Sequence, residues 1–190
     1  VIADNCALIT NRIFDNYETL PASSLFIGAF LYTIQIYADF SGYSDMAIGF
    51  SRLIGFNVTK NFDFPFFSQN IAEFWRKWHI SLTSWLTEYV FTPLSIAFRD
   101  YDKIGITMAI LINFTIIGIW HGANWTYIAW GFINALYFLP LLLLNRNRKN
   151  VDDFTLGFNF DSFRTLANIL MTFSIRTNLI SRKFLVPLES

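Results

Sequence analysis

The sequence predicts an all-α, multi-pass transmembrane protein with re-entrant and interfacial amphipathic helices. Two observations carry this prediction. Of the 190 residues, 54% are hydrophobic, including 22 Phe, 8 Tyr and 6 Trp, which exceeds the usual composition of a soluble domain. In addition, no Asp, Glu, Lys or Arg occurs between Ile104 and Leu144. Lipid is therefore the expected solvent for much of the chain.

The uncharged stretch 104–144 is long enough for two membrane crossings, because a helix needs about 20 residues to span the hydrocarbon core. A charged loop, Arg99–Lys103, precedes it, and basic residues follow it at Arg146, Arg148 and Lys149. Two crossings place both flanks on one side of the membrane. The excess of basic residues predicts that this side is cytoplasmic and that the turn between the helices faces outward.

A third apolar segment, Ala22–Ala38, follows Pro21 and is just long enough to span the membrane or to lie among other helices. The polar insertion Asp39–Asp45 then interrupts the apolar run. Within a membrane, irregular backbone is tolerated only where protein or water covers it, so we expect a re-entrant or interior turn here. Asp39 and Asp45 would cap this turn or orient other groups.

The region 57–68 is expected to be an extended loop, because Pro65 disfavours helix at the residue before it. A helix should begin near Asn70, since Asn70 and Glu73 have the spacing of a capping box. The pattern predicts one amphipathic helix that lies along the membrane interface and ends at Pro93. Its apolar positions follow helical spacing: Ile71, Phe74, Trp75, Trp78, Leu82, Trp85 and Leu86.

Several classes of function are disfavoured. The formal net charge is zero, with 14 basic and 14 acidic residues, so a nucleic-acid footprint is not expected. The single cysteine, Cys6, excludes an internal disulfide and a multi-cysteine metal site. His79 and His121 are the two histidines, and without paired carboxylates they are weak evidence for zinc. We expect neither a metal nor a bound cofactor.

His121 is the strongest candidate for chemistry. It lies in the motif Trp120–Trp125, the polar interruption of the uncharged stretch, and an ionisable group at membrane depth suggests function. A neutral imidazole can act as a general base on a hydroxyl. Gly122 would allow close approach, while Trp120 and Trp125 would exclude water. A structural hydrogen bond by His121 remains an equal alternative.

Further candidates have two interpretations each. His79 should project from the apolar face of the amphipathic helix, either as a structural hydrogen-bonding residue or as a second acid–base group. Arg76 would meet an anionic donor or, more commonly, lipid headgroups. Asn124, from the same motif as His121, is a supporting candidate.

Four ordered motifs together resemble the membrane-bound O-acyltransferase (MBOAT) family, in its bacterial branch of alginate O-acetyltransferase-like proteins: Asp39–Gly49, Asn61–Pro65, Glu73–Leu82 and Trp120–Trp125. The resemblance covers 1–144 and implies part of a helical catalytic core with a funnel or tunnel. It implies that His121 is catalytic and that His79 is the family's second histidine. Residues 145–190 are expected to form a basic loop and an atypical C-terminal segment, and the chain, which starts at Val1, is expected to be an excerpt.

The resemblance also implies the reaction. An acyl group, usually acetyl, would pass to hydroxyls of an extracytoplasmic polysaccharide at the bacterial plasma (inner) membrane, often through a partner acetyltransferase. The implied donor is acetyl-CoA or a carrier thioester.

Two alternatives stay open. One is the related transfer of D-alanine from a carrier protein to teichoic acids. The other is a transporter or channel segment, because polar residues and broken helices within a membrane also mark substrate paths.

Overall fold

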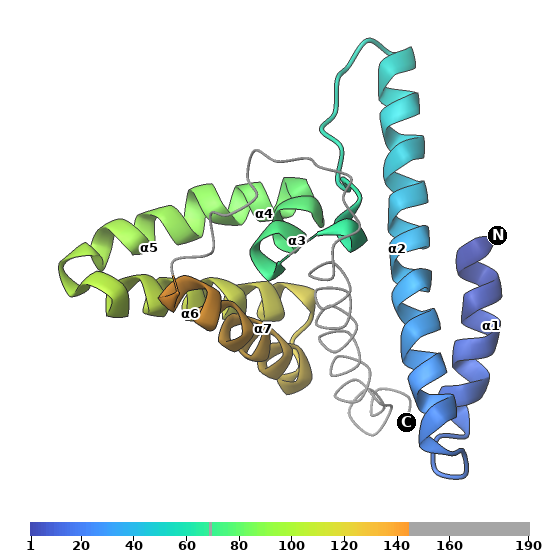
Figure 1. The fold of residues 1–190 in the computed structure, drawn as a ribbon. Coiled ribbons are helices and arrows are strands. Elements are labelled where there is room, and N and C mark those ends of the chain that lie inside the picture. Colours follow the sequence, from blue (N-terminus) through green and yellow to red (C-terminus); the bar gives the residue numbers. More distant parts are fainter. Residues whose placement is uncertain (69, 145–190) are drawn as a thin grey trace. The chain divides into compact units, whose positions relative to one another are not determined.

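The computed structural model describes residues 1–68 and 70–144. The regular elements of this part of the chain are all helical, which confirms the predicted all-α class, and Figure 1 traces their order. They belong to two compact units, one within Val1–Lys60 and one that begins at Asn61. Arg146, Arg148, Lys149 and the rest of the predicted C-terminal segment 145–190 lie outside the described residues.

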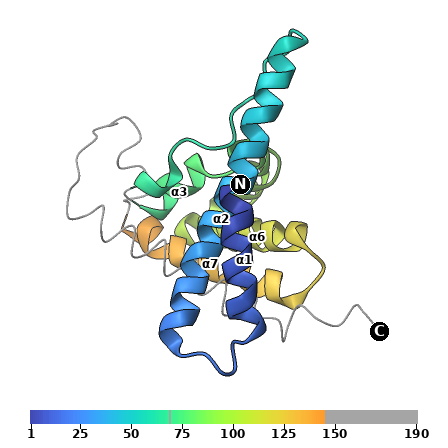
Figure 2. The same cartoon turned by 90° about the vertical axis from the view of Figure 1, so that its right-hand side faces the viewer.

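The first unit is a pair of antiparallel helices, α1 (Ile2–Asp15) and α2 (Ala22–Leu53), which lie side by side in Figures 1 and 2. The hydroxyl of Thr10 donates to Gln35 Oε1 across the pair at 2.9 Å. A Cβ atom at Gly28 would lie 2.9 Å from Ile13 Cγ2. The glycine therefore allows the two helices to approach closely.

The expected re-entrant turn at Asp39–Asp45 is wrong, because α2 continues through these residues without a break. The segment contains no proline, and its one glycine, Gly42, costs a helix only about 1 kcal/mol relative to alanine. Each residue added to an existing helix also gains a hydrogen bond. A polar patch is therefore not enough to end a long helix.

The second unit holds a series of short helices followed by two long ones. In chain order they are η1 (Pro65–Phe67), α3 (Ile71–Lys77), α4 (Ile80–Leu86), the π-helical turn η2 (Thr87–Phe91), α5 (Thr92–Ala97), η3 (Arg99–Tyr101), α6 (Asp102–His121) and α7 (Trp125–Leu143). Buried side chains from α4, α6 and α7 form its core: Leu86, Ile110, Phe114, Ile117, Trp130 and Ala135. The charged residues of 99–103 are exposed as predicted, but they form η3 and the first residues of α6 instead of a loop.

The start of α3 confirms the predicted cap, since Asn70 Oδ1 accepts a hydrogen bond from Glu73 N at 2.8 Å. The single amphipathic helix expected to follow is wrong. Trp78 is extended, and His79 has a left-handed backbone with φ 47°. The segment before η1 takes a backbone acceptor at this point, because Asp63 N donates a hydrogen bond to the carbonyl of Lys77 at 3.1 Å.

The expected end of the helix at Pro93 is also wrong, since Pro93 lies in the first turn of α5. Proline has no N–H to donate, so a regular α-helix would lose a hydrogen bond at this point. The π-helical turn η2 lies immediately before it. Its last bond runs from Thr92 N to the carbonyl of Thr87, to which the Thr92 hydroxyl also donates at 2.7 Å. The wider turn lets the chain continue past the proline.

Two segments, Arg99–His121 and Trp125–Leu143, are long and apolar enough to cross a bilayer by length and composition. They correspond to the two crossings predicted within 104–144, whereas α2 is not among these candidates in the described part of the chain. Close packing joins α6 and α7. A Cβ atom at Gly131 would lie 2.3 Å from the carbonyl oxygen of Phe114, so only glycine fits there.

Candidate active site

His121 is the last residue of α6 and is half-buried among aromatic rings. The ring of Trp130, on α7, meets it edge to face with centroids 5.1 Å apart, and the ring of Tyr127 lies nearly parallel to it at 6.4 Å. Trp130 is only 5% exposed. The helix hairpin therefore encloses one side of the imidazole with apolar surface.

His79 lies at the kink between α3 and α4. A left-handed backbone costs a non-glycine residue about 1–3 kcal/mol and persists only when its surroundings impose it. Burial lowers the pKa of His79 below its ordinary value of 6.5, because desolvation disfavours the charged form. The residue is therefore kept neutral near pH 7, which suits a hydrogen-bonding or proton-accepting role.

Trp120 joins the two histidines. Its ring centroid lies 5.8 Å from that of His79 and 5.0 Å from that of His121, each in an edge-to-face arrangement. The two candidate residues thus meet the same indole although 42 positions separate them in the sequence. The prediction that His79 faces inward from a continuous helix gave the wrong backbone, since α3 ends at Lys77. The ring nevertheless reaches the Trp120 side chain.

Gly122 has a specific steric role next to His121. A Cβ atom at this position would lie 2.7 and 2.8 Å from two ring carbons of Tyr127. Tyr127 is the residue whose ring lies parallel to His121. The absence of a side chain at Gly122 therefore allows the tyrosine to take its place beside the imidazole.

Asn124 begins α7. Its Oδ1 accepts hydrogen bonds from the backbone N of Thr126 at 3.1 Å and from the Thr126 hydroxyl at 3.2 Å. This is the geometry of a helix N-cap. The structure thus gives Asn124 a structural task that fixes the turn after His121.

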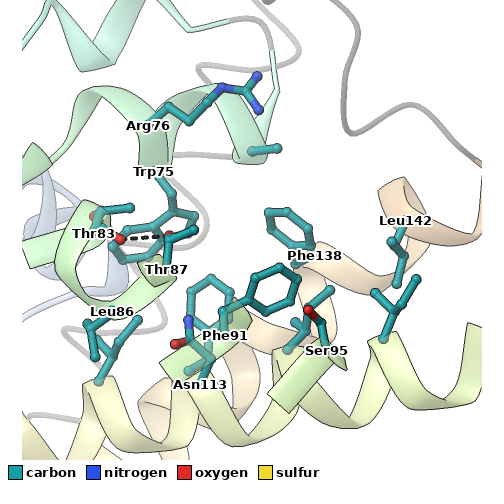
Figure 3. A pocket seen from close by; sticks show the side chains of 15 residues that line it. Trp75, Arg76, Thr83, Leu86, Thr87, Phe91, Ser95, Asn113, Phe138 and Leu142 are labelled. Atoms are coloured by element: carbon teal, nitrogen blue, oxygen red, sulfur yellow. Dashed lines mark hydrogen bonds between the residues drawn. The ribbon is translucent and has the colours of Figure 1, made fainter. Parts of the chain in front are cut away.

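Arg76 is exposed on α3 and lies at a cavity of about 560 Å³ between the short helices and the α6–α7 pair (Figure 3). The cavity walls are mainly apolar and include Trp75, Phe91 and Phe138. Neither histidine lines the cavity. Trp75 connects it to the histidine region, because its ring lies 6.1 Å from that of Trp130, which in turn contacts His121.

Asp39 and Asp45 belong to the first unit, where both are exposed on α2. The structure brings His79, Trp120, His121 and Gly122 together within the second unit. Within 1–68 and 70–144 no group of three or more His, Cys, Asp or Glu side chains could hold a metal ion.

Tyr127 and Trp130 are the contacts of His121 that the sequence did not reveal. Trp120 and Trp125 were expected to shield the site from water, but they are 57% and 81% exposed. Helical spacing contained a usable signal, because Trp130 is four residues after Thr126 and four before Asn134, and all three are buried on one face of α7. Trp125 falls outside this face.

The model of the MBOAT, membrane-bound O-acyltransferase family matches residues 11–178. The chain therefore belongs to the membrane-bound O-acyltransferase family.

Several individual proteins of known description are similar to this chain over part of their length. A protein described as probable alginate O-acetylase AlgI of Azotobacter vinelandii is 46% identical over 134 residues, which cover 68% of this chain and 26% of the relative. The peptidoglycan O-acetyltransferase of Helicobacter pylori is 40% identical over 136 residues, covering 72% and 25%. The teichoic acid D-alanyltransferase of Streptococcus thermophilus is 35% identical over 133 residues, covering 63% and 32%. The chain thus spans about a quarter to a third of these proteins.

Proposed function

We propose that this chain carries the histidine centre of an O-acyltransferase that transfers an acetyl group to hydroxyls of an extracytoplasmic polysaccharide. The observation that carries the proposal is the enclosure of His121 by Tyr127 and Trp130, beside a Trp120 ring that also contacts His79. Membership of the O-acyltransferase family supports acyl transfer as the reaction.

In the proposed mechanism, His121 is the general base. Its neutral imidazole takes the proton of a substrate hydroxyl, and the oxygen attacks the carbonyl carbon of a thioester donor. The carbon–sulfur bond then breaks, the ester forms, and the imidazolium returns the proton to the leaving thiolate. His79 is the second acid–base candidate, and Arg76, at the edge of the cavity, is the proposed contact for an anionic part of the donor.

The acceptor and the donor follow from the relatives and the chemistry. The two acetyltransferase relatives act, by their descriptions, on alginate and on peptidoglycan, so a cell-surface polysaccharide is the proposed acceptor. Acetyl-CoA or a carrier thioester is the proposed donor. We place the full protein in the bacterial plasma membrane as a multi-pass protein, with an extracytoplasmic acetyltransferase as its proposed partner.

A second candidate is D-alanyl transfer to teichoic acids, which the Streptococcus thermophilus relative favours. This relative is less identical to the chain than the two acetyltransferase relatives are, so D-alanyl transfer ranks behind acetyl transfer. Supplying membranes with an aminoacyl carrier in place of an acetyl donor separates the two, because only one donor will label the acceptor. Solute flux that persists without both histidines, together with no acyl transfer, would support the transport alternative instead.

The test compares the O-acetyl content of extracellular polysaccharide in cells that carry the full-length parent protein or its His121→Ala variant, at matched membrane expression. We expect the variant to lose acetylation. Leu136→Ala, an exposed position on α7, is the matched control and should retain it. Wild-type acetylation by His121→Ala would refute His121 as the base.

A further inference from the structure

His79 occupies the N-cap position of a helix, but its side chain does not cap that helix. It is the N-cap of α4, a place where a side chain normally accepts a hydrogen bond from the first turn. The imidazole of His79 makes no such bond to α4, and its ring lies against Trp120. Another group must therefore satisfy the backbone N–H groups at the start of α4.

Asn61 supplies that group from a different segment of the chain. Its backbone carbonyl accepts a hydrogen bond from Ile80 N at 2.9 Å. Its side-chain Oδ1 accepts from the Ser81 hydroxyl at 2.6 Å and from Ser81 N at 3.3 Å. One asparagine thus binds the first two residues of α4 from outside the helix.

The neighbours of Asn61 hold the other side of the kink. Phe62 pairs with Trp78 as an isolated β-bridge, and their rings lie edge to face at 5.0 Å. Asp63 N donates to the carbonyl of Lys77 at 3.1 Å. Residues 61–63 therefore form hydrogen bonds with the chain on both sides of His79, at Lys77 before it and at Ile80 and Ser81 after it. Because a left-handed backbone is unfavourable for a non-glycine residue, it persists only where the surrounding structure fixes it in this way.

We propose that Asn61 is a positioning residue for His79: by capping α4 in place of the histidine, it fixes the left-handed backbone and directs the imidazole to Trp120. This inference rests on the proposed function, because it assigns Asn61 a part in acyl transfer through His79. Asn61 itself does not take part in the chemistry.

A double-mutant cycle in the full-length parent tests the proposal. The initial rate of acetyl transfer is measured for wild type, Asn61→Ala, His79→Ala and the double variant, at matched membrane expression. We expect Asn61→Ala to lower the rate on the order of tenfold to a hundredfold, the scale of a misplaced active-site group. In the His79→Ala background the same substitution should have almost no further effect.

The second readout is the modification of His79 by diethyl pyrocarbonate at pH 8, located by peptide mass spectrometry. Asn61→Ala should make His79 react faster, because its ring is released from Trp120. Asn61→Asp keeps an acceptor oxygen for Ser81 and should restore the slow reaction and most of the rate. Asn70→Ala removes the cap of α3 and not that of α4, so it is the matched control and should leave His79 as slow as in wild type.

The positioning role would be overturned if Asn61→Ala lowered the rate by the same factor in the wild-type and His79→Ala backgrounds. It would also be overturned if Asn61→Ala left the reactivity of His79 unchanged. If Asn61→Ala does not accumulate, Ser81→Ala removes the 2.6 Å bond from the other side and takes its place in the cycle. The separate His121→Ala comparison reports on the proposed function, so failure of the two ideas can be distinguished.

Discussion

His121 and His79 both occupy the boundary of a helix, one as the last residue of α6 and the other immediately before α4. Backbone groups at such boundaries lack partners within the helix and must find them elsewhere. At His79 another residue acts as the cap, since Asn61 binds the start of α4, and after His121 the turn is fixed by Asn124, which caps the start of the next helix, α7. The histidine rings are held by aromatic neighbours instead.

The lowered pKa of His79 predicts a pH dependence of stability. The unfolded chain binds a proton near the ordinary pKa of 6.5, whereas the folded chain binds it only at lower pH. The free energy of unfolding should therefore fall as the pH drops below about 6.5, and it should be insensitive to this group above that value. Denaturation of the solubilised parent between pH 8 and pH 5 measures the effect. His79→Gln should have a shallower dependence, and identical slopes would contradict the assignment.

Gly122→Ala should impair acyl transfer more than it impairs folding. The added methyl group would meet the ring of Tyr127 at 2.7 Å and push it from its place beside His121. Overpacking of this kind typically costs about 1–3 kcal/mol, which the protein relieves by moving the ring. Acetylation at matched expression is the measurement. Gly42→Ala, where a Cβ meets nothing within 4 Å, is the control and should remain fully active.

At the residue scale, part of the cluster of histidines and aromatic rings could be predicted from the sequence, while its catalytic role stays a prediction. His121 and Gly122 were identifiable because a polar motif interrupts an uncharged stretch, and the structure places both against Tyr127. Tyr127 and Trp130 were missed and Trp125 was misplaced. Which aromatic faces the histidine depends on the rotation of α7 about its axis, and that rotation is set by packing against α6 at Gly118 and Gly131.

At the scale of elements, the long helices were easier to predict than the breaks between them. The apolar stretch 104–144 predicted two helices, and α6 and α7 occupy it. The break at His79 was not predictable from local pattern, because it depends on hydrogen bonds with 61–63. Conversely, Asp39–Asp45 and Pro93 have the composition of helix ends, yet helix propagation and a π-helical turn carry the chain through them.

The cap of α7 provides an element-scale prediction. Asn124→Ala should lower the free energy of unfolding by about 1 kcal/mol, because the Thr126 N–H would lose its acceptor. Asn124→Asp retains an oxygen at the same place and should remain near wild type in both stability and acetylation. Thermal denaturation of the solubilised parent measures the first quantity. A stable but inactive Asn124→Asp would instead give the amide a direct part in the reaction.

At the scale of the whole molecule, the family match extends from residue 11 to residue 178, beyond the four motifs that suggested it. The all-α class and the family were predictable because motif spacing and apolar composition persist over long stretches. The division into 1–144 and 145–190 stays a prediction. The grouping of 61–144 apart from α1 and α2 was not predicted, since it arises from tertiary contacts.

The membrane topology of the α6–α7 hairpin is directly testable. If α6 and α7 each cross the bilayer, Lys103 and Ala123 lie on opposite faces of it, with Lys103 on the cytoplasmic side. In a cysteine-free parent, an impermeant maleimide should label Ala123→Cys in intact cells and Lys103→Cys only after permeabilisation. Labelling of both from outside would show that α6 does not cross.

The left-handed backbone of His79 sets the proposed acid–base role of its side chain against the stability of the fold. Glycine adopts this conformation without steric penalty. Selection for stability alone would therefore favour glycine over histidine at this position. Histidine brings no gain in backbone stability at this position, so any benefit comes from its side chain. In a laboratory population selected only for thermal endurance, position 79 should drift to glycine or asparagine, and the rise in endurance should accompany a decline in turnover.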